Sequence, residues 1–125
     1  MSLIRISEAE WHVMNIVWSR APVSSADVVS ALMEEQQWQP RTIRTLLDRL
    51  VKKKALKLKT NGKRNLYEPL ITMEACVRQE SRSFLERVFG GEPAAMLLHL
   101  VGEAKLSKAE IRKLKEILSD NEKYP

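Results

Sequence analysis

The sequence predicts a mainly α-helical protein with a small β-hairpin. Apolar residues recur at helical spacing through most of the chain and alternate with polar residues around positions 56–70, where an Asn-Gly pair separates the two alternating stretches. Helix, short turn, basic helix and hairpin is the element order of a winged helix-turn-helix. We therefore expect a winged helix-turn-helix DNA-binding domain over residues 1–71 and a helical dimerisation domain over residues 72–125.

The first expected helix begins after Ser7. Ser7-Glu-Ala-Glu10 matches the capping box, in which serine and glutamate side chains cap each other's backbone N–H groups. The helix runs to about Arg20 and carries Trp11 and Trp18 on one side. Burial in a small core is favoured for these rings over stacking on nucleotide bases.

The next two helices are separated by a short turn. Ser24 and Ser25 are good N-caps for a helix that ends near Gln36, and Pro40 suits the first turn of the following helix. The third helix is amphipathic, with one apolar stripe made by Ile43, Leu46, Leu47, Leu50 and Val51. Its opposite face carries Arg41, Thr45, Asp48 and Lys52, with Thr42, Arg44 and Arg49 on the flanks.

This outer face opens a strongly basic stretch. Residues 41–64 contain ten Lys or Arg residues against a single acid, Asp48, and the excess positive charge of the chain lies within residues 1–70. Charged residues opposite an apolar stripe are typical of any surface helix, so a merely solvated face is the alternative. An ordinary surface mixes both signs, and the imbalance therefore favours contact with a polyanion.

The spacing changes from helical to alternating after this helix. Leu56 and Leu58 alternate with lysines, and residues 60–64 make a turn before a second strand that ends near Leu70. Asn-Gly is a strong hairpin signal because both residues tolerate positive φ. A wing of this kind lies along the phosphate backbone, so we expect the basic side chains at its tip to point outward.

The region after residue 72 is expected to form a homodimer. The segment Ala94–Val101 is apolar almost all round, and a capping box at Ser107-Lys-Ala-Glu110 opens a last helix. A helix without a polar face must be buried, and a second copy of the chain is the economical cover. Such pairing sets two basic helices about 34 Å apart, one turn of duplex DNA. The expected interface residues are Phe84, Val88, Met96, Leu97, Leu100, Ile111, Leu114 and Leu118.

Composition argues against several classes of site. Cys76 is the only cysteine, and with only His12 and His99 the chain offers neither a disulfide nor a metal-ligand cluster. No phosphate-binding glycine loop and no nucleophile-and-base spacing occur, so we expect no cofactor and no enzyme. The N-terminal residues lack the apolar core of a signal peptide, and no apolar run is long enough to cross a bilayer, which predicts a cytoplasmic protein.

Two residues of the C-terminal region allow more than one interpretation. His99 is expected to be a satisfied core histidine, with a ligand or a pH switch as the alternative. Cys76 is expected to be a small buried residue, with a thiol sensor as the alternative.

Three segments resemble the penicillinase repressors of bacteria (BlaI, MecI and CopY types), and the likeness covers nearly the whole chain. They are ISEAEWHVMNIVW at 6–18, WQPRTIRTLLDRL at 38–50 and GKRNLYEP at 62–69. The resemblance implies a homodimeric repressor that binds palindromic operators of antibiotic-resistance or stress genes. It also implies induction by a protease that cleaves the dimerisation region, or by a metal in the copper-responsive branch.

The chain departs from this family in three places. The Asn-Phe bond that some members lose to a protease corresponds here to His99-Leu100, which is the possible cleavage position. The cysteine cluster of the copper-responsive members is absent from the sequence. Lys54 replaces the glycine that usually follows the recognition helix, so it either extends that helix or adopts a strained left-handed conformation.

The basic residues divide into two expected roles. The first turns of a recognition helix reach base edges, where Arg pairs with guanine and the Thr methyl group contacts thymine. The groove-facing set is Arg41, Thr42, Arg44, Thr45 and Arg49, and the phosphate-binding set is Lys52, Lys59, Asn61, Lys63 and Arg64. An ion pair between Arg64 and Glu68 is the alternative for that arginine.

The sequence thus predicts a DNA-binding transcriptional repressor. A winged-helix module for protein interactions is one alternative, because fold does not settle function. A family member that senses a metal or a redox signal is another. The basic stretch favours the repressor over an adaptor, which has no need of it.

Overall fold

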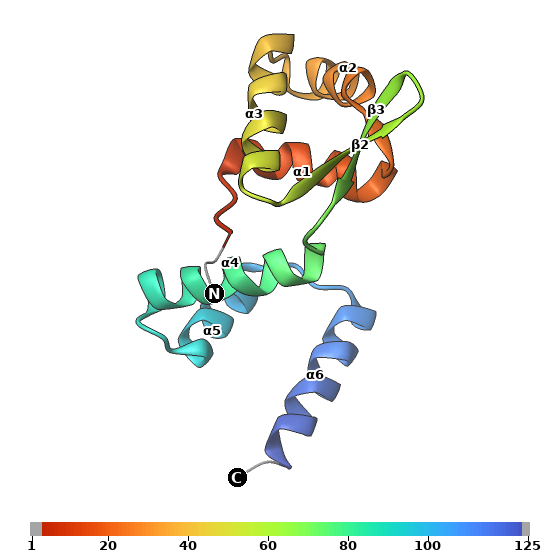
Figure 1. The fold of residues 1–125 in the computed structure, drawn as a ribbon. Helices are drawn as coiled ribbons and strands as arrows, with labels where there is room; N and C mark the ends of the chain where they lie inside the picture. Colours follow the sequence, from red (N-terminus) through yellow and green to blue (C-terminus); the bar gives the residue numbers. More distant parts are fainter. Residues whose placement is uncertain (1–3, 124–125) are drawn as a thin grey trace. The chain divides into compact units, whose positions relative to one another are not determined.

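The computed structural model describes residues 4–123, and the chain divides into two compact units between Ser81 and Arg82. The first unit is a winged helix-turn-helix, as the sequence predicts (Figure 1). The elements, in chain order, are α1 Glu8–Arg20, β1 Val23–Ser24, α2 Ser25–Gln36, α3 Pro40–Lys52, β2 Leu56–Asn61, β3 Arg64–Pro69, α4 Met73–Phe89, α5 Pro93–Glu103 and α6 Lys108–Glu122.

The three helices of the first unit begin where local sequence signals predict. The Glu10 backbone N–H donates to Ser7 Oγ at 3.1 Å, and the Ser7 N–H donates to Glu10 Oε1 at 2.8 Å, which completes the capping box of α1. Ser24 Oγ accepts the Asp27 N–H at 3.2 Å and caps α2. Pro40 is the first residue of α3. The expected helix starts are therefore confirmed.

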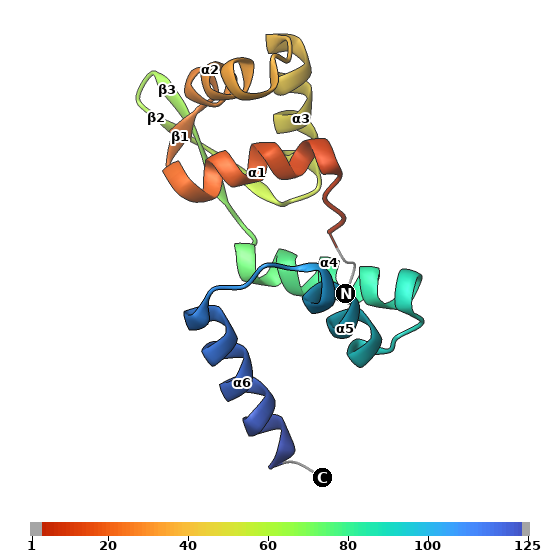
Figure 2. The same cartoon turned by 180° about the vertical axis from the view of Figure 1, so that it is seen from behind.

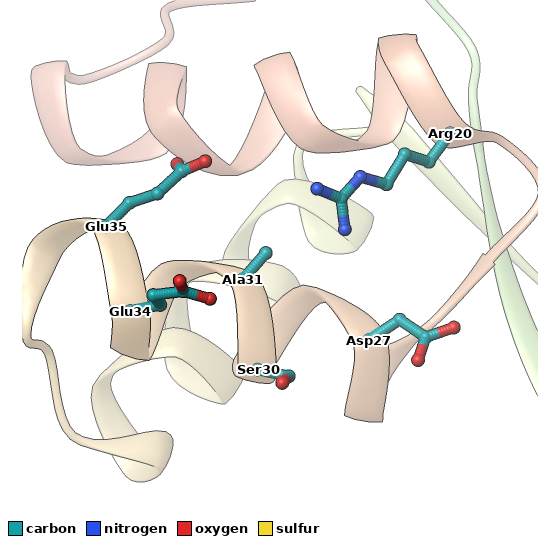
Figure 3. Close-up of a pocket in the computed structure, with 6 residues that line it drawn as sticks. All are labelled: Arg20, Asp27, Ser30, Ala31, Glu34 and Glu35. Carbon is teal, nitrogen blue, oxygen red and sulfur yellow. The ribbon is translucent and has the colours of Figure 1, made fainter.

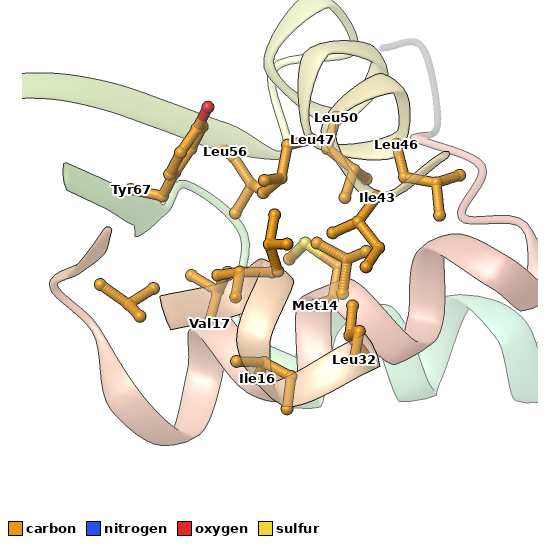
Figure 4. Close-up of a cluster of buried hydrophobic side chains, with 14 of the residues drawn as sticks. Met14, Ile16, Val17, Leu32, Ile43, Leu46, Leu47, Leu50, Leu56 and Tyr67 are labelled. Carbon is orange, nitrogen blue, oxygen red and sulfur yellow. The ribbon is translucent and has the colours of Figure 1, made fainter. Parts of the chain in front are cut away.

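These helices and the sheet enclose one apolar core (Figure 4). Met14 and Val17 of α1 meet the apolar stripe of α3, and Leu32 of α2 and Leu56 of β2 lie beside them. The largest of these side chains have almost no exposed surface. Burial of this stripe fixes how α3 is rotated about its own axis, because turning it would expose apolar surface.

Trp11 and Trp18 are half-buried rather than enclosed in this core. Their rings meet edge to face with centroids 5.6 Å apart. The Trp18 indole N–H donates to the Ile71 carbonyl at 3.0 Å, and the ring packs against the core. Trp18 therefore links α1 to the segment that follows the sheet. The expected burial of Trp11 and Trp18 in the core is confirmed only in part, because both side chains are half-buried.

The sheet has three antiparallel strands in the order β1-β3-β2, where the sequence predicts two. The missing strand is β1, in which Val23 pairs with Tyr67 and Ser24 with Leu66. The tip of the β2–β3 hairpin stands clear of the helices in both views (Figures 1 and 2). Its two-residue turn is Gly62-Lys63, since Asn61 still pairs with Arg64, and Gly62 supplies the positive φ of 67°.

The first half of α4 belongs to the first unit. Cys76 is 3% exposed, which confirms the expected small buried residue, and the Gln79 side-chain amide donates to the Ile4 carbonyl at 2.8 Å. In the second unit α4 ends before Gly90, whose φ is 58°, and the expected capping box opens α6.

The apolar helix α5 differs from expectation. None of its residues is buried within one copy of the chain, and Leu98 is 76% exposed. His99 is also exposed, with its ring 6.2 Å from that of Phe89, so the expectation of a core histidine is wrong for a single chain. The reason is that the second unit has too few elements to surround α5.

Candidate nucleic-acid interface

The outer face of α3 is exposed because the opposite stripe is buried. Ile43, Leu47 and Leu50 have no exposed surface, and the residues across the helix axis from them face solvent. All members of the expected groove-facing set are exposed: Arg41, Thr42, Arg44, Thr45 and Arg49. The helix thus presents guanidinium groups and threonine side chains on one side.

Thr45 has its hydroxyl proton engaged within the helix. Its Oγ1 donates to the Arg41 backbone carbonyl at 2.9 Å. The side chain retains its methyl group and a lone pair for an outside partner. In a major groove the thymine C5-methyl group is the matching partner for that methyl group.

The rest of the expected DNA-binding surface lies at the end of α3 and on the wing, which is the β2–β3 hairpin. The exposed members of the expected phosphate-binding set are Lys52, Lys59, Lys63 and Arg64, and the side chain of Asn61 lies outside the described part. Glu68 has Lys57 as its cross-strand partner, and no ion pair joins it to Arg64 among the described residues. Among the described residues, the Arg64 guanidinium therefore lacks the intrachain partner that the alternative role requires.

Lys53 differs from the other cations of the stretch because its ammonium group pairs with a buried carboxylate. Its Nζ lies 2.5 Å from Glu10 Oε1 and donates to the Arg5 carbonyl at 2.8 Å. The Glu10 side chain is only 2% exposed, and the same oxygen accepts the Ser7 N–H. The end of α3 is thereby fastened to the segment before α1. The sequence offers a partial signal, an acid in a capping box, but does not identify its cationic partner.

Burial raises the pKa of the Glu10 carboxyl. The hydrogen bonds from Lys53 and Ser7, together with the positive charge of Lys53, lower this pKa by more than burial raises it. The net result is a pKa below the ordinary value of 4.5. Glu10 therefore carries its charge at neutral pH despite its burial, and that charge is compensated by Lys53.

The start of α3 is fixed by a second contact with α1. Trp38 lies in the turn between α2 and α3, and its ring meets that of His12 edge to face at 5.5 Å. The Gln36 side-chain nitrogen lies 3.3 Å from His12 Nδ1. Gln37 ends α2 in the left-handed conformation, with φ of 58°. The angle between α2 and α3 therefore rests on packing of this turn against α1.

The second unit exposes much of its apolar surface. Of the residues expected at a dimer interface, Met96 and Leu114 are half-buried. The exposed ones are Phe84, Val88, Leu97, Leu100, Ile111 and Leu118. The possible cleavage position, His99-Leu100, is exposed as well and lies within α5.

A hollow of about 560 Å³ lies between α1 and α2 (Figure 3). Arg20 reaches into it from α1, and Asp27, Glu34 and Glu35 line it from α2. Sites for small organic molecules are lined mainly by apolar side chains. The charged lining of this hollow does not fit that class of ligand.

Two further kinds of feature are absent from residues 4–123. No group of His, Cys, Asp and Glu side chains there has the arrangement of a metal site. Within the same range, no helix has the length and apolar character needed to span a bilayer.

Burial raises the pKa of the Cys76 thiol, which disfavours the reactive thiolate.

The chain is similar to known repressors over most of its length. The family model for the penicillinase repressor matches residues 6–120. The penicillinase repressor of Bacillus licheniformis is 34% identical over 117 residues, which cover 94% of this chain and 91% of that protein. The methicillin resistance regulatory protein MecI of Mammaliicoccus sciuri is 34% identical over 114 residues, 91% of this chain and 93% of that protein.

Solved structures resemble the first unit. The solution structure of monomeric Bacillus licheniformis BlaI in complex with the blaP half-operator is 36% identical, with a TM-score of 0.54 over 59% of this chain and 92% of that one. A DNA-bound MepR mutant of S. aureus has a TM-score of 0.54 over 92% of this chain and 76% of that one. At 19% identity this second match supports the fold alone.

Proposed function

Because the chain belongs to the penicillinase repressor family, we propose that it is a transcriptional repressor that binds a palindromic duplex operator as a homodimer. The observation that carries this proposal is the exposed outer face of α3 together with the wing. These elements hold nearly all of a stretch with ten Lys or Arg residues and one acid. The solved half-operator complex of BlaI, a relative of the first unit, supports the same partner.

In this proposal α3 enters the major groove and reads base edges. The side chains that do so are Arg41, Thr42, Arg44, Thr45 and Arg49, because they line the exposed face from the first turn onward. Lys52, Lys59, Asn61, Lys63 and Arg64 bind phosphates on either side of the groove. Lys53 has a different role, since its ammonium group is held by Glu10.

Residues 1–71 are the DNA-binding domain in this proposal, and residues 72–125 pair two copies of the chain. The exposed apolar side chains of α4, α5 and α6 support pairing through this C-terminal region, because burying them removes apolar surface from water. The regulated genes are β-lactamase or related resistance genes, by analogy with the names of the relatives. Induction by a protease that cleaves at His99-Leu100 is the proposed release mechanism.

The test measures binding of the whole protein to a pool of random duplexes over a range of salt concentrations. We expect log affinity to fall linearly with log salt concentration, and repeated selection to yield a palindromic sequence. Lys63→Ala should weaken binding to every duplex alike and flatten the slope by about one unit for each bound protomer, because each protomer loses one phosphate contact.

Lys115→Ala is the matched control, since it removes an exposed cation from the second unit. It should leave the slope unchanged. Binding that does not depend on salt, or a Lys63→Ala loss confined to one sequence, would contradict the proposal.

A further inference from the structure

Asp48 is the only acid in the basic stretch, and it lies on the exposed face of α3. It follows Thr45 by three residues and Arg41 by seven, so all three side chains lie on one side of the helix. A carboxylate in this position faces the same partner as the groove-facing arginines.

No cation holds this carboxylate among the described residues. The ion pairs found there join Glu10 to Lys53 and Asp120 to Lys123. Arg44 and Lys52 are four residues before and after Asp48, at the spacing that favours ion pairs on a helix, yet neither forms one with it. The carboxylate is therefore free to accept hydrogen bonds from a partner outside the chain.

The charge of Asp48 also affects a residue of the sheet, Tyr67. Burial raises the pKa of the Tyr67 hydroxyl on β3, and the negative charge of Asp48 raises it further. The carboxylate thus lies close enough to β3 for its charge to act there.

A free carboxylate is costly for a protein that only binds phosphates, because it repels them. The cost disappears where the carboxylate meets a hydrogen-bond donor. In the major groove the base-edge donors are the amino groups of cytosine and adenine, and a carboxylate accepts from the cytosine N4 amino group in the pairing usual for Asp.

Resting on the proposed function, we propose that Asp48 is a specificity-determining residue that accepts a hydrogen bond from a cytosine N4 amino group in each half of the operator. A guanine or thymine at that position presents O6 or O4 to the carboxylate and is rejected. Asp48 therefore lowers the affinity for duplexes in general. The affinity is restored where a cytosine occupies the position that the Asp48 carboxylate contacts.

The experiment selects duplexes from a random pool with the whole wild-type protein, Asp48→Asn and Asp48→Ala. Wild type should prefer cytosine at one position of each half-site by about tenfold, the factor for one good base contact. Asp48→Asn should shift that preference to adenine, because an amide pairs with adenine N6 and N7. Asp48→Ala should lose the preference at that position alone and bind random duplex more tightly.

Glu35→Ala is the matched control, because it removes the same charge from an exposed position on α2 outside the basic stretch. It should keep the wild-type preference at every position. The unfolding midpoint of each variant is measured to test that the first unit remains folded.

If Asp48→Ala and Asp48→Asn keep the wild-type base preference and only tighten binding to all duplexes, the inference is overturned while the proposed function stands. If the wild-type protein shows no salt-dependent duplex binding, the proposed function and the inference fall together.

Discussion

At the scale of single residues, Lys54 occupies a backbone conformation that favours glycine. Its φ is 67°, its N–H donates to the Val51 carbonyl at 3.0 Å, and the Ala55 N–H donates to the Leu50 carbonyl at 2.9 Å. This pair of hydrogen bonds is the Schellman motif, which usually has glycine where Lys54 stands. Of the two interpretations that the sequence allows, the strained left-handed conformation is confirmed.

Lys54→Gly should therefore stabilise the first unit. Relief of left-handed strain exceeds the entropy that glycine gains in the unfolded chain, which leaves about 0.5–1 kcal/mol. Urea unfolding followed by tryptophan fluorescence measures this difference. Lys54→Ala is the control, since it removes the same charge but keeps the strained backbone. Equal stabilisation by both variants would attribute the gain to charge and not to conformation.

At the scale of elements, α3 is held at both ends by α1 and the segment before it. Trp38 packs against His12 at its start, and Lys53 binds Glu10 and the Arg5 carbonyl at its end. The orientation of a recognition helix decides which base edges its side chains reach. The contacts with α1 therefore position the arginines of α3 without touching DNA.

Glu10→Gln should destabilise the first unit at neutral pH by about 1.5–3 kcal/mol, the range for a lost hydrogen bond to a charged group. The folded-state pKa of Glu10 lies below 4.5, so its contribution is present above that pH and is lost as pH falls through the folded value. Wild type should therefore lose stability more steeply than Glu10→Gln below about pH 4.5.

Denaturant unfolding at several pH values measures both curves. Glu8→Gln is the control, because Glu8 is an exposed acid in the same helical turn. It should follow the wild-type curve. Parallel curves for wild type and Glu10→Gln would show that the ion pair makes no pH-dependent contribution.

The elements that sequence reasoning found are those with local signals. Ser7, Ser24 and Pro40 mark helix starts within a few residues of chain, and Gly62 marks the hairpin turn. Strand β1 has two residues and no periodicity, and it exists because β3 offers a free edge to it. The pairing of Lys53 likewise depends on Glu10, 43 residues away, which no local pattern reveals.

At the scale of the whole molecule, the second unit has more apolar surface than one chain can cover. Leu98 on α5 is 76% exposed, Val88 on α4 is 56% exposed and Leu118 on α6 is 56% exposed. Large exposed apolar side chains on several neighbouring helices mark an interaction surface. The sequence identified most of this surface, but it could not show that the chain leaves α5 without a buried residue.

Leu98 should contribute strongly to a homodimer, because no large apolar side chain of the described residues is more exposed. Leu98→Lys should convert a dimer into a monomer at micromolar concentration, since pairing would then bury an unpaired charge. Light scattering gives the mass. The first unit should keep its unfolding midpoint, and affinity for a single half-site should be unchanged. Affinity for the palindrome should fall by about 100-fold or more, because two linked contacts become independent.

Leu70→Lys is the control for this variant. Leu70 is 57% exposed in the first unit, so the substitution adds the same charge at a comparably exposed apolar position. It should leave the dimer mass intact. A wild-type protein that is monomeric, or a Leu98→Lys variant that stays dimeric with full affinity for the palindrome, would mean that α5 does not pair two copies. The exposed apolar surface of the second unit would then need a different partner.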